Sequence, residues 1–508
     1  MGFGIGTPEH DERRPSIATH HPHLAVVTRW GPDDHVMRSL ASNLLEHGVH
    51  FDHGLRQDLL DDLPEDLEPY KAVVLDAPAM EFVAADEGRR RRLERFASGD
   101  GYVFMANDPT ERTLRGFHAN CLVDLSNLHL VQDILLHAQV PTFAPGWDAA
   151  QLARPDDRIL EGLADRLLRL VEPMREWGEM ALHWWKALKA LVELEGREDA
   201  RDVLVASVRR LGEAVPPGLN HDKVGGQFAT VWLYEQTGDR GPMDRARARI
   251  DEVIAKRPRH MGVLTGCGFQ DDPLGLNPGK DGLSTFFFSN STNRRQTLWN
   301  EGLHLYAPAF GAFARITGDR AYLQEMLSYV EHIRRYQLRD DGLLAHSSSH
   351  GTPFGAAWAR GQVHALLGML YLLEEMDRDD PGFNDVLHVI DTVGRALVPH
   401  QDPGTGLWRN VIDHPDARLE SSGTAGIGYV LARGIREGWL DRAPFEPAVR
   451  AAWRGLKRMY WRGGIAANCR GSGASVHRAY YLGRPQGFAT GPPTAWSTML
   501  LLELRKLA

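Results

Sequence analysis

The chain has 508 residues, of which 43% are apolar and 25% charged. These values are typical of a globular protein that is long enough for two or more domains and a large core. The formal net charge is -9, and no face rich in lysine and arginine emerges to neutralise phosphates. We therefore expect no nucleic-acid partner.

The cysteines and the apolar runs indicate the compartment. Cys121, Cys267 and Cys469 lie far apart and match neither a disulfide framework nor a metal-ligand spacing such as C-x-x-C, which favours a reducing compartment. No apolar run approaches the roughly 18 residues that cross a membrane, and the N-terminus has no apolar signal segment. We predict a cytoplasmic protein with no membrane partner. Residues 1–22 are rich in proline and histidine, and we interpret them as a flexible segment rather than as a metal site.

Residues 23–145 have the pattern of a small α/β domain. The apolar runs 24–27, 72–75 and 102–105 predict buried parallel strands, and the spacing over 36–46 and 87–96 predicts helices. The first strand is not followed by G-x-G-x-x-G, and the chain contains no G-x-x-x-x-G-K-[ST]. The usual reasons to assign a nucleotide cofactor are therefore missing.

Residues 155–508 have a different texture, because amphipathic helical stretches follow one another. We predict helices over about 158–172, 177–195, 199–214, 223–237, 242–256, 297–317, 320–337, 358–376, 383–398, 422–437, 445–459 and 494–507. Gly238-Asp239 and Gly318-Asp319 each end one helix shortly before another begins. Twelve helices are the number in an (α/α)6 barrel, so we predict a small parallel-sheet α/β domain followed by such a barrel.

Two tryptophan-containing segments carry the chemistry. Trp299-Asn300-Glu301-Gly302-Leu303-His304 places a carboxylate beside an indole at a helix start, and Trp358-Ala359-Arg360-Gly361-Gln362 places a guanidinium in the same way. Tryptophan stacks on sugar rings, and arginine binds a carboxylate through two hydrogen bonds. This combination predicts a pocket for a sugar acid. Alternatively, both tryptophans are core residues and Glu301 is an ordinary helix-start acid.

The span from about 160 to 508 resembles the unsaturated rhamnogalacturonyl hydrolases of glycoside hydrolase family 105 and, more distantly, the unsaturated glucuronyl hydrolases of family 88. The matching motifs occur in family order at 222–226, 233–239, 299–303, 316–319, 342–346, 358–361, 420–425 and 434–440. The stretch 70–76 with 99–103 resembles amidotransferase-like flavodoxin-type domains. The cysteine that such domains use is absent here, so we expect residues 23–145 to be non-catalytic, and a homodimer is plausible.

The resemblance implies hydration of an unsaturated sugar. The substrate would be an acidic oligosaccharide with a terminal 4,5-unsaturated uronic acid left by a polysaccharide lyase. A carboxylic acid protonates the enol ether, water adds at the neighbouring carbon, and the hemiketal opens to release the rest of the chain. Neither a metal nor another cofactor is implied. The acid must hold its proton, so we expect a raised pKa for its carboxyl group.

Glu301 matches the catalytic aspartate of the family, and Asp222 matches a second essential aspartate on an earlier helix. His346 matches a pocket histidine, and Trp358 with Arg360 matches the substrate-contacting Trp-x-Arg. The other candidate substrate-binding residues are Trp299, His304, His364, Arg295, Ser421 and Ser422.

Two departures from the family leave alternatives open. Glu301 replaces aspartate, and His364 stands where the family has a second tryptophan. A conventional exo-acting uronidase, for example a β-glucuronidase on saturated sugar acids, is one alternative, with Asp222 as its second carboxylate. A non-catalytic glycan-binding protein is another. Asp222 could also be a helix N-cap, His364 a core histidine, and Ser421 with Ser422 a capping stretch.

Overall fold

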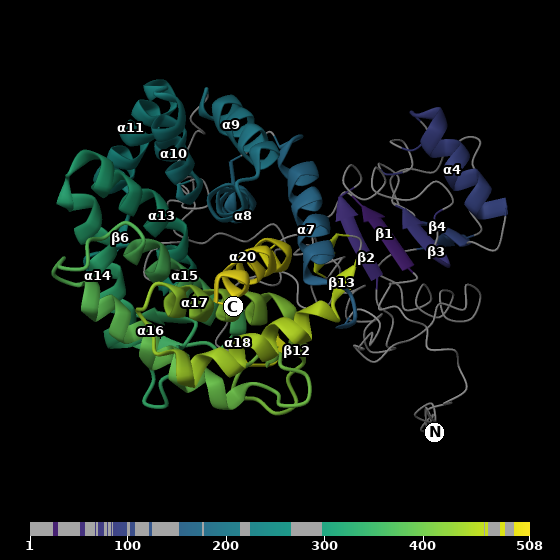
Figure 1. Cartoon of the computed structure of the whole chain (residues 1–508). Helices are drawn as coiled ribbons and strands as arrows, with labels where there is room; N and C mark the ends of the chain where they lie inside the picture. The colour runs from purple at the N-terminus through teal and green to yellow at the C-terminus, as the bar shows by residue number, and fades with distance from the viewer. Residues whose placement is uncertain are drawn as a thin grey trace.

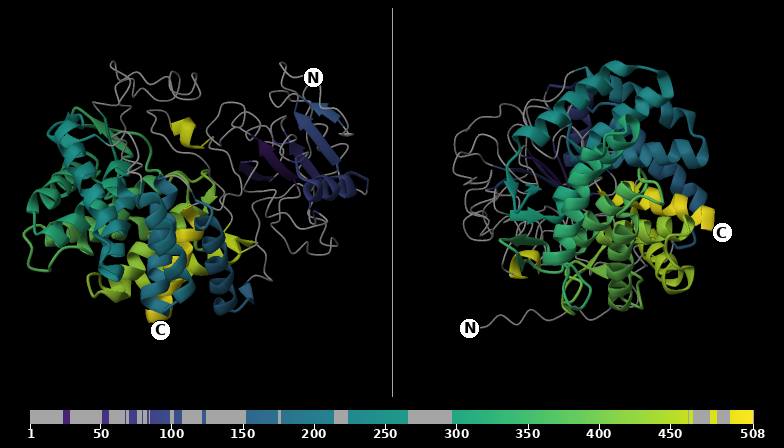
Figure 2. Two further views of the ribbon diagram at one scale, coloured as in Figure 1. Left: turned by 90° about the horizontal axis from the view of Figure 1, so that it is seen from above. Right: turned by 90° about the vertical axis from the view of Figure 1, so that its left-hand side faces the viewer.

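The structure is a computed structural model (Figures 1 and 2). It describes residues 24–28, 51–55, 67, 70–75, 79, 83, 85–98, 102–106, 121–123, 152–174, 177–213, 224–265, 297–461, 463–465, 478–482 and 492–507. The N-terminal segment 1–22 and the predicted helix 36–46 lie outside these residues.

The N-terminal part contains a five-stranded parallel sheet. Its strands are β1 (Leu24–Thr28), β2 (Phe51–Leu55), β3 (Ala72–Leu75), β4 (Tyr102–Ala106) and β5 (Cys121–Val123), with α4 (Glu87–Ser98) after β3. The strand order is β2-β1-β3-β4-β5, and every neighbouring pair is parallel. The three runs predicted as strands lie in β1, β3 and β4. This order is that of flavodoxin-like sheets, in which helices cover both faces and the strands are apolar throughout.

The C-terminal part is mostly helical, as predicted. Its long helices are α7 (Asp156–Val171), α8 (Glu179–Glu195), α9 (Glu198–Gly212), α10 (Phe228–Thr237), α11 (Arg240–Lys256), α13 (Asn300–Thr317), α14 (Arg320–Tyr336), α15 (Ala359–Leu373), α16 (Phe383–Leu397), α17 (Ser421–Arg436), α18 (Arg442–Lys457) and α20 (Pro492–Leu507). Each predicted helical stretch coincides with one of them. Within the described part of the chain, no helix is both long and apolar enough to cross a membrane.

These helices alternate between two layers. α13, α15, α17 and α20 are buried on nearly all sides, and every residue of α15 is buried, while α8 buries nine of its 17 residues. α7, α14, α16 and α18 bury one apolar stripe and expose a charged face. A helix that is apolar all round belongs inside, and an amphipathic one belongs outside. The inner helices pack in the circular order α8, α10, α13, α15, α17, α20, with the 3-10 turn η2 (Gly225–Gln227) joining α10 to α8. The helical part is therefore a closed barrel.

Glycines let the inner helices approach closely. A Cβ atom on Gly426 of α17 would lie 2.3 Å from Cγ1 of Val363 in α15, and one on Gly368 of α15 would lie 2.7 Å from Cγ of Leu303 in α13. Neither distance leaves room for a side chain, so α13, α15 and α17 need glycine at these contacts.

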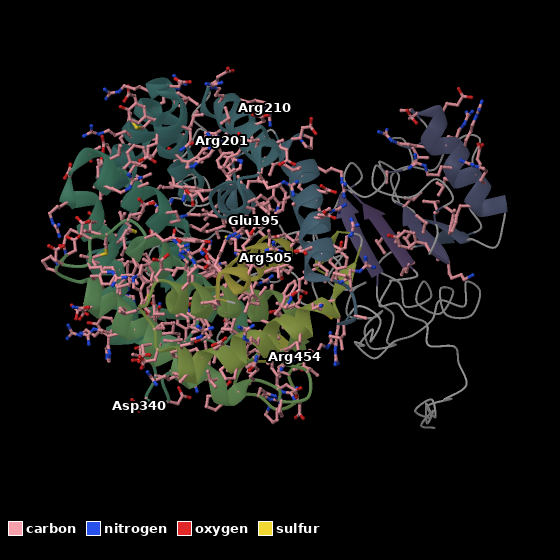
Figure 3. The ribbon with its side chains drawn as sticks, viewed as in Figure 1. Glu195, Arg201, Arg210, Asp340, Arg454 and Arg505 are labelled. Atoms are coloured by element: carbon pink, nitrogen blue, oxygen red, sulfur yellow. The ribbon has the colours of Figure 1, made fainter. Side chains whose placement is uncertain are left out.

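The last helix closes the ring by apolar contacts and by ion pairs. Arg505 of α20 pairs with Asp157 of α7, and its Nε lies 3.3 Å from Oε1 of Glu195 in α8 (Figure 3). These pairs are on the surface, so each contributes little stability by itself. The apolar contact of α20 with α8 and α17 is the main interaction that holds the first and last inner helices of the ring together.

The two Gly-Asp pairs make the same turn between an inner and an outer helix. Gly238 and Gly318 end α10 and α13 with φ values of 75° and 71°, a conformation that costs glycine little. Asp239 and Asp319 then cap α11 and α14 by accepting backbone hydrogen bonds of 3.1 and 3.0 Å. The helix ends predicted at these positions are confirmed.

The prediction of a helix from residue 297 was wrong by three residues. Thr297–Trp299 forms strand β8, which pairs with β9 (Ser347–Ser349), and β9 pairs with β10 (Thr352–Phe354). The side chains of β8 are buried and include Thr297 and Trp299, residue types that suit a strand. The remaining short strands are β6 (Arg259–His260), β7 (Val263–Leu264), β11 (Trp408–Arg409), β12 (Leu419–Glu420), β13 (Tyr460–Trp461) and β14 (Gly464–Ile465).

Candidate active site

Strand β8 delivers Glu301 to the first turn of α13. Trp299 is extended and precedes the helix, and Asn300 fixes its start. The backbone N–H of Asn300 donates to the carbonyl of His346 at 3.2 Å. Its side-chain amide donates to the carbonyls of Ala345 and Gly361 at 3.2 and 3.0 Å. The starts of α13 and α15 and the segment before β9 are thereby held together.

This arrangement brings Glu301 against His346. Nε2 of His346 lies 2.7 Å from Oε1 of Glu301, and Nδ1 of His346 lies 2.8 Å from the hydroxyl of Tyr481. Tyr481 comes from the short helix α19 (Arg478–Leu482), and all three side chains are buried. Tyr481, His346 and Glu301 form a hydrogen-bonded chain that ends at the carboxylate.

The pKa of Glu301 differs from the expectation. Burial raises the pKa of this carboxyl group, but the charge and hydrogen bond of His346, followed by the charge of His364, outweigh burial. The pKa of Glu301 is therefore below its usual value, whereas we expected it to be raised. The reason is the direct contact with His346, which the spacing of the two residues in the sequence does not reveal.

Trp358 and Arg360 stand beside this chain. The indole N–H of Trp358 donates to Oδ1 of Asn410 at 2.9 Å, which fixes the ring. The Trp358 ring lies 4.8 Å from the His346 ring, and Cζ of Arg360 lies 4.7 Å from the centroid of the Trp358 ring. Arg360 is buried and stacked, so its guanidinium is held in one place for a planar anion.

One helical turn deeper, three imidazoles meet. His304 follows Glu301 on α13, His364 follows Arg360 on α15, and His183 lies on α8. The ring of His304 lies 5.0 Å from each of the other two, and the three rings are buried. Trp496 of α20 contacts all three, at 4.9 Å from the His183 ring. We call His183, His304 and His364 the histidine layer.

Glu179 stands at the start of α8, above His183. Its Oε1 lies 3.3 Å from Nε2 of His183, and about 31% of its side chain is exposed. Burial of the carboxyl group raises its pKa, but the hydrogen bond and charge of His183 and the charges of His364 and Arg360 have the larger effect and lower the pKa to about 2. Glu179 is therefore an ionised carboxylate that solvent reaches in this site. The sequence patterns did not point to Glu179, although its spacing from His183 equals that of Arg360 from His364.

The serines predicted to bind substrate are the first two residues of α17, and both are buried. The hydroxyl of Ser422 donates to the carboxylate of Glu420, which also accepts from the backbone N–H of Ser422 at 2.7 Å and from that of Gly423. Capping therefore accounts for Ser422. Asp222 and Arg295 lie outside the described residues.

The structure brings together Glu301, Trp299, His304, His346, Trp358, Arg360 and His364 of the predicted residues. It adds Glu179, His183, Asn410, Tyr481 and Trp496, which the sequence did not single out. In the described segments, no group of three or more His, Cys, Asp or Glu side chains is arranged to hold a metal ion.

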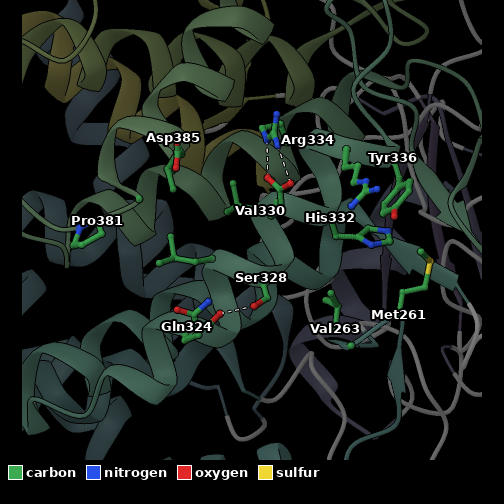
Figure 4. A pocket seen from close by; sticks show the side chains of 16 residues that line it. Met261, Val263, Gln324, Ser328, Val330, His332, Arg334, Tyr336, Pro381 and Asp385 are labelled. Atoms are coloured by element: carbon green, nitrogen blue, oxygen red, sulfur yellow. Dashed lines mark hydrogen bonds and ion pairs between the residues drawn. The ribbon is translucent and has the colours of Figure 1, made fainter.

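A separate cavity of about 570 Å³ lies on the outer layer, between α14, the β6–β7 hairpin and the start of α16 (Figure 4). In its lining, Arg334 binds Glu331 through hydrogen bonds of 2.6 and 2.7 Å. His332 lies 2.7 Å from the hydroxyl of Ser348. The cavity contains none of the residues around Glu301.

The sequence profile described as Glycosyl Hydrolase Family 88 matches residues 162–507, about two thirds of the chain. This chain belongs to glycosyl hydrolase family 88. A curated relative, the unsaturated 3S-rhamnoglycuronyl hydrolase of Formosa agariphila, is 28% identical over 220 residues, which are 40% of this chain. The chain spans 58% of the length of that relative.

Solved structures agree with the family 88 assignment at the level of the fold. A possible member of family 105 from Salmonella enterica serovar Paratyphi A has a TM-score of 0.59 at 17% identity, covering 70% of this chain and 96% of that one. The unsaturated glucuronyl hydrolase of Bacillus sp. GL1 has a TM-score of 0.51 at 18% identity, covering 69% and 96%. The share of this chain that these structures cover corresponds in size to the helical barrel.

Proposed function

We propose that this chain is a glycoside hydrolase that removes the terminal 4,5-unsaturated uronic acid from oligosaccharides released by polysaccharide lyases. The observation that carries the proposal is the buried Glu301–His346 pair beside Arg360, which is stacked on Trp358. In this proposal the Glu301–His346 pair transfers a proton, the guanidinium of Arg360 binds the sugar carboxylate, and the indole of Trp358 covers the sugar ring. The names of the relatives agree with this substrate class.

Arg360 sets the orientation of the sugar. A guanidinium binds a carboxylate through two parallel hydrogen bonds, and both are strong in a site from which water is excluded. Arg360 follows the N-cap residue Trp358 by two positions on α15, so the bound sugar lies against the indole. The C4–C5 double bond, next to the carboxylate, then faces the start of α13.

Glu301 is the proton carrier in this proposal. The carboxylate of the substrate brings a like charge near Glu301 and excludes water, and both effects raise the pKa of the Glu301 carboxyl group on binding. Its proton adds to C4, and water adds to C5 and returns a proton to Glu301. The hemiketal then opens and the bond to the rest of the oligosaccharide breaks. His346 and Tyr481 hold the carboxylate in position.

A second function has one observation in its favour. An exo-acting uronidase on saturated sugars needs two carboxylates, and Glu179 supplies a second, ionised one in the same site. Asp222, the residue predicted for this role, lies outside the described residues. The same site without catalysis would make a glycan-binding protein.

One assay separates these functions. Incubation with lyase digests of pectic, ulvan-type, gellan-type and glycosaminoglycan polymers should remove the ultraviolet absorbance of the unsaturated uronate. Release of a chromogenic aglycone from a saturated glucuronide, with no loss of absorbance from any digest, would instead establish the uronidase. Binding without either reaction would establish the glycan-binding protein.

The domain organisation belongs to the proposal as well. Residues 23–145 would form a non-catalytic flavodoxin-type domain, and residues 155–508 an (α/α)6 barrel. The alternating inner and outer helices and the strand order β2-β1-β3-β4-β5 support this division. A cytoplasmic location and a homodimer stay predictions from the sequence.

A further inference from the structure

The histidine layer contains buried polar atoms that the described protein does not satisfy. Neither ring nitrogen of His304 has a hydrogen-bond partner among the described residues, and the same holds for Nδ1 of His183 and of His364. The indole N–H of Trp496 and the hydroxyl of Tyr371 are also without one there. Buried polar atoms nearly always have partners, so atoms left over in a site are there for a ligand or for water.

The charges around the layer determine which ligand suits it. Burial lowers the pKa of His304 and of His364, that of His364 to about 4, so both rings are neutral near pH 7. A neutral imidazole donates one hydrogen bond and accepts another, as a hydroxyl group does. Glu179 is ionised and only accepts. Lys186, one turn below His183, is bound to Glu374 at 3.1 Å and does not offset this charge.

Among the described residues, the cation beside Trp358 is Arg360, one turn above His364. The anionic group of a sugar acid therefore belongs at the upper level, beside Trp358. The lower level offers donors and acceptors with a negative charge next to them, which fits neutral hydroxyl groups. A second anionic group of the ligand at this level would lie next to the negative charge of Glu179. No free cation among the described residues of the layer would balance these two charges, so burying the group would cost free energy.

We propose that Glu179 and the histidine layer bind the free ring hydroxyl groups of the uronate whose carboxylate pairs with Arg360, and that the site thereby excludes a uronate sulfated on those hydroxyls. The inference rests on the proposed function and adds a specificity to it. Glu179 and the histidine layer act here as binding residues, while the proton transfer remains with Glu301.

The test uses two small probes that occupy only the site of the terminal sugar. They are the methyl glycoside of 4,5-unsaturated glucuronic acid and the same compound with a 2-O-sulfate. For the wild-type protein we expect kcat/KM for the sulfated probe to be lower by about 10²-fold, measured as loss of ultraviolet absorbance. Glu179→Gln keeps the shape of the side chain and removes its charge. The ratio of kcat/KM for the free-hydroxyl probe to kcat/KM for the sulfated probe should therefore shrink by about tenfold.

A variant of the layer gives the complementary result. His304→Gln should lower kcat/KM for the free-hydroxyl probe by about tenfold or more, because a buried group that binds a hydroxyl is lost. The control is Glu331→Gln on the exposed face of α14, which should leave both probes unchanged. Unfolding temperatures of all variants show whether each is folded.

The outcomes separate this inference from the proposed function. If the wild-type protein consumes both probes equally well, or if Glu179→Gln leaves the ratio unchanged, the hydroxyl subsite is wrong while the hydrolase stands. If it consumes neither probe and none of the lyase digests, the proposed function is wrong and the inference is lost with it.

Discussion

The two ends of the inner helices treat their buried charges differently. At the C-terminal ends, Glu374 lies 3.1 Å from Nζ of Lys186 and 3.7 Å from Nε of Arg433, and Arg433 also lies 3.2 Å from Glu503. At the N-terminal ends, Oε2 of Glu301 has no hydrogen-bond partner among the described residues. The C-terminal end pairs its charges within the protein, whereas the N-terminal end leaves one oxygen of Glu301 without a partner among the described residues.

This difference teaches where to look for function in a barrel of this type. Both ends contain buried carboxylates with lowered pKa values, so a perturbed pKa alone does not distinguish them. What distinguishes them is the remaining hydrogen-bonding capacity. We expect the paired, C-terminal end to stabilise the ring and the N-terminal end to bind the ligand. Variants at Glu301, Glu374 and Arg360 test this division, and a variant at His332 tests a buried group outside both ends.

The largest effect is expected at Glu301. Glu301→Gln keeps the shape of the side chain and removes the proton carrier, so kcat should fall by about 10²-fold to 10⁴-fold while the fold and the affinity are retained. Glu301→Asp, the family-typical residue, should also be slower, because it withdraws the carboxylate by about 1.5 Å from its contact with His346. Steady-state kinetics on an unsaturated substrate measures both. Turnover near wild type in Glu301→Gln would show that another residue is the acid, and Glu179 would be the first residue to examine.

At the paired end, Glu374→Gln should destabilise the protein by about 3–5 kcal/mol, because Lys186 would remain buried without its partner. Urea unfolding measures the change. Activity per folded molecule should be unchanged, in contrast to Glu301→Gln. Glu331→Gln, which breaks an exposed pair with Arg334, is the matched control and should cost less than about 1 kcal/mol. A specific loss of turnover in folded Glu374→Gln would contradict the division between the ends.

Arg360→Ala should weaken the binding of an anionic sugar by about 2–3 kcal/mol, which is a rise in KM on the order of 10²-fold. A neutral glycoside should lose little. The comparison of KM for the two ligands isolates the carboxylate contact from the packing of the guanidinium on Trp358. Equal losses for both ligands would remove Arg360 from the carboxylate site.

The smallest effect concerns a buried histidine outside both ends. Burial, and then the charge of His260, lowers the pKa of His332 to about 4, below its unfolded value of about 6.5. As the pH falls from 6.5 to 4, the unfolded chain binds a proton that the folded one does not, so stability is lost in this window. From pH 7.5 to pH 5 this contribution is about 2 kcal/mol.

His332→Gln should remove that part of the pH dependence, as measured by urea unfolding at both pH values. His388→Gln is the control, because His388 is exposed on α16. An unchanged pH dependence in His332→Gln would show that the histidine is not held neutral.

Local signals made much of the fold predictable. The spacing of apolar residues and the residues that end helices are properties of neighbouring positions. Gly238-Asp239 and Gly318-Asp319 therefore predicted their turns correctly. The start of α13 was missed because β8 exists only through its pairing with β9, which lies about fifty residues further along. Pairing between distant segments leaves no trace in a local window.

The candidate site was predictable where a motif carried it and not elsewhere. Glu301, Trp358 and Arg360 stand in recognisable segments. Tyr481 is 135 residues from its partner His346, and His183 looks like any buried position of an amphipathic helix. The pKa of Glu301 was predicted in the wrong direction for the same reason, since its direction is decided by His346, which comes from another part of the chain.

The common direction of the inner helices has one more consequence. The starts of α8, α13, α15, α17 and α20 all lie at the end of the ring that contains Glu301. Each helix start carries roughly half a positive charge from its aligned peptide dipoles. A chain with a net charge of -9 would repel an anionic sugar from a distance. Within the last few ångströms, however, the convergent dipoles would attract such an anion, and salt would screen this attraction less than that of lysine and arginine side chains at the surface.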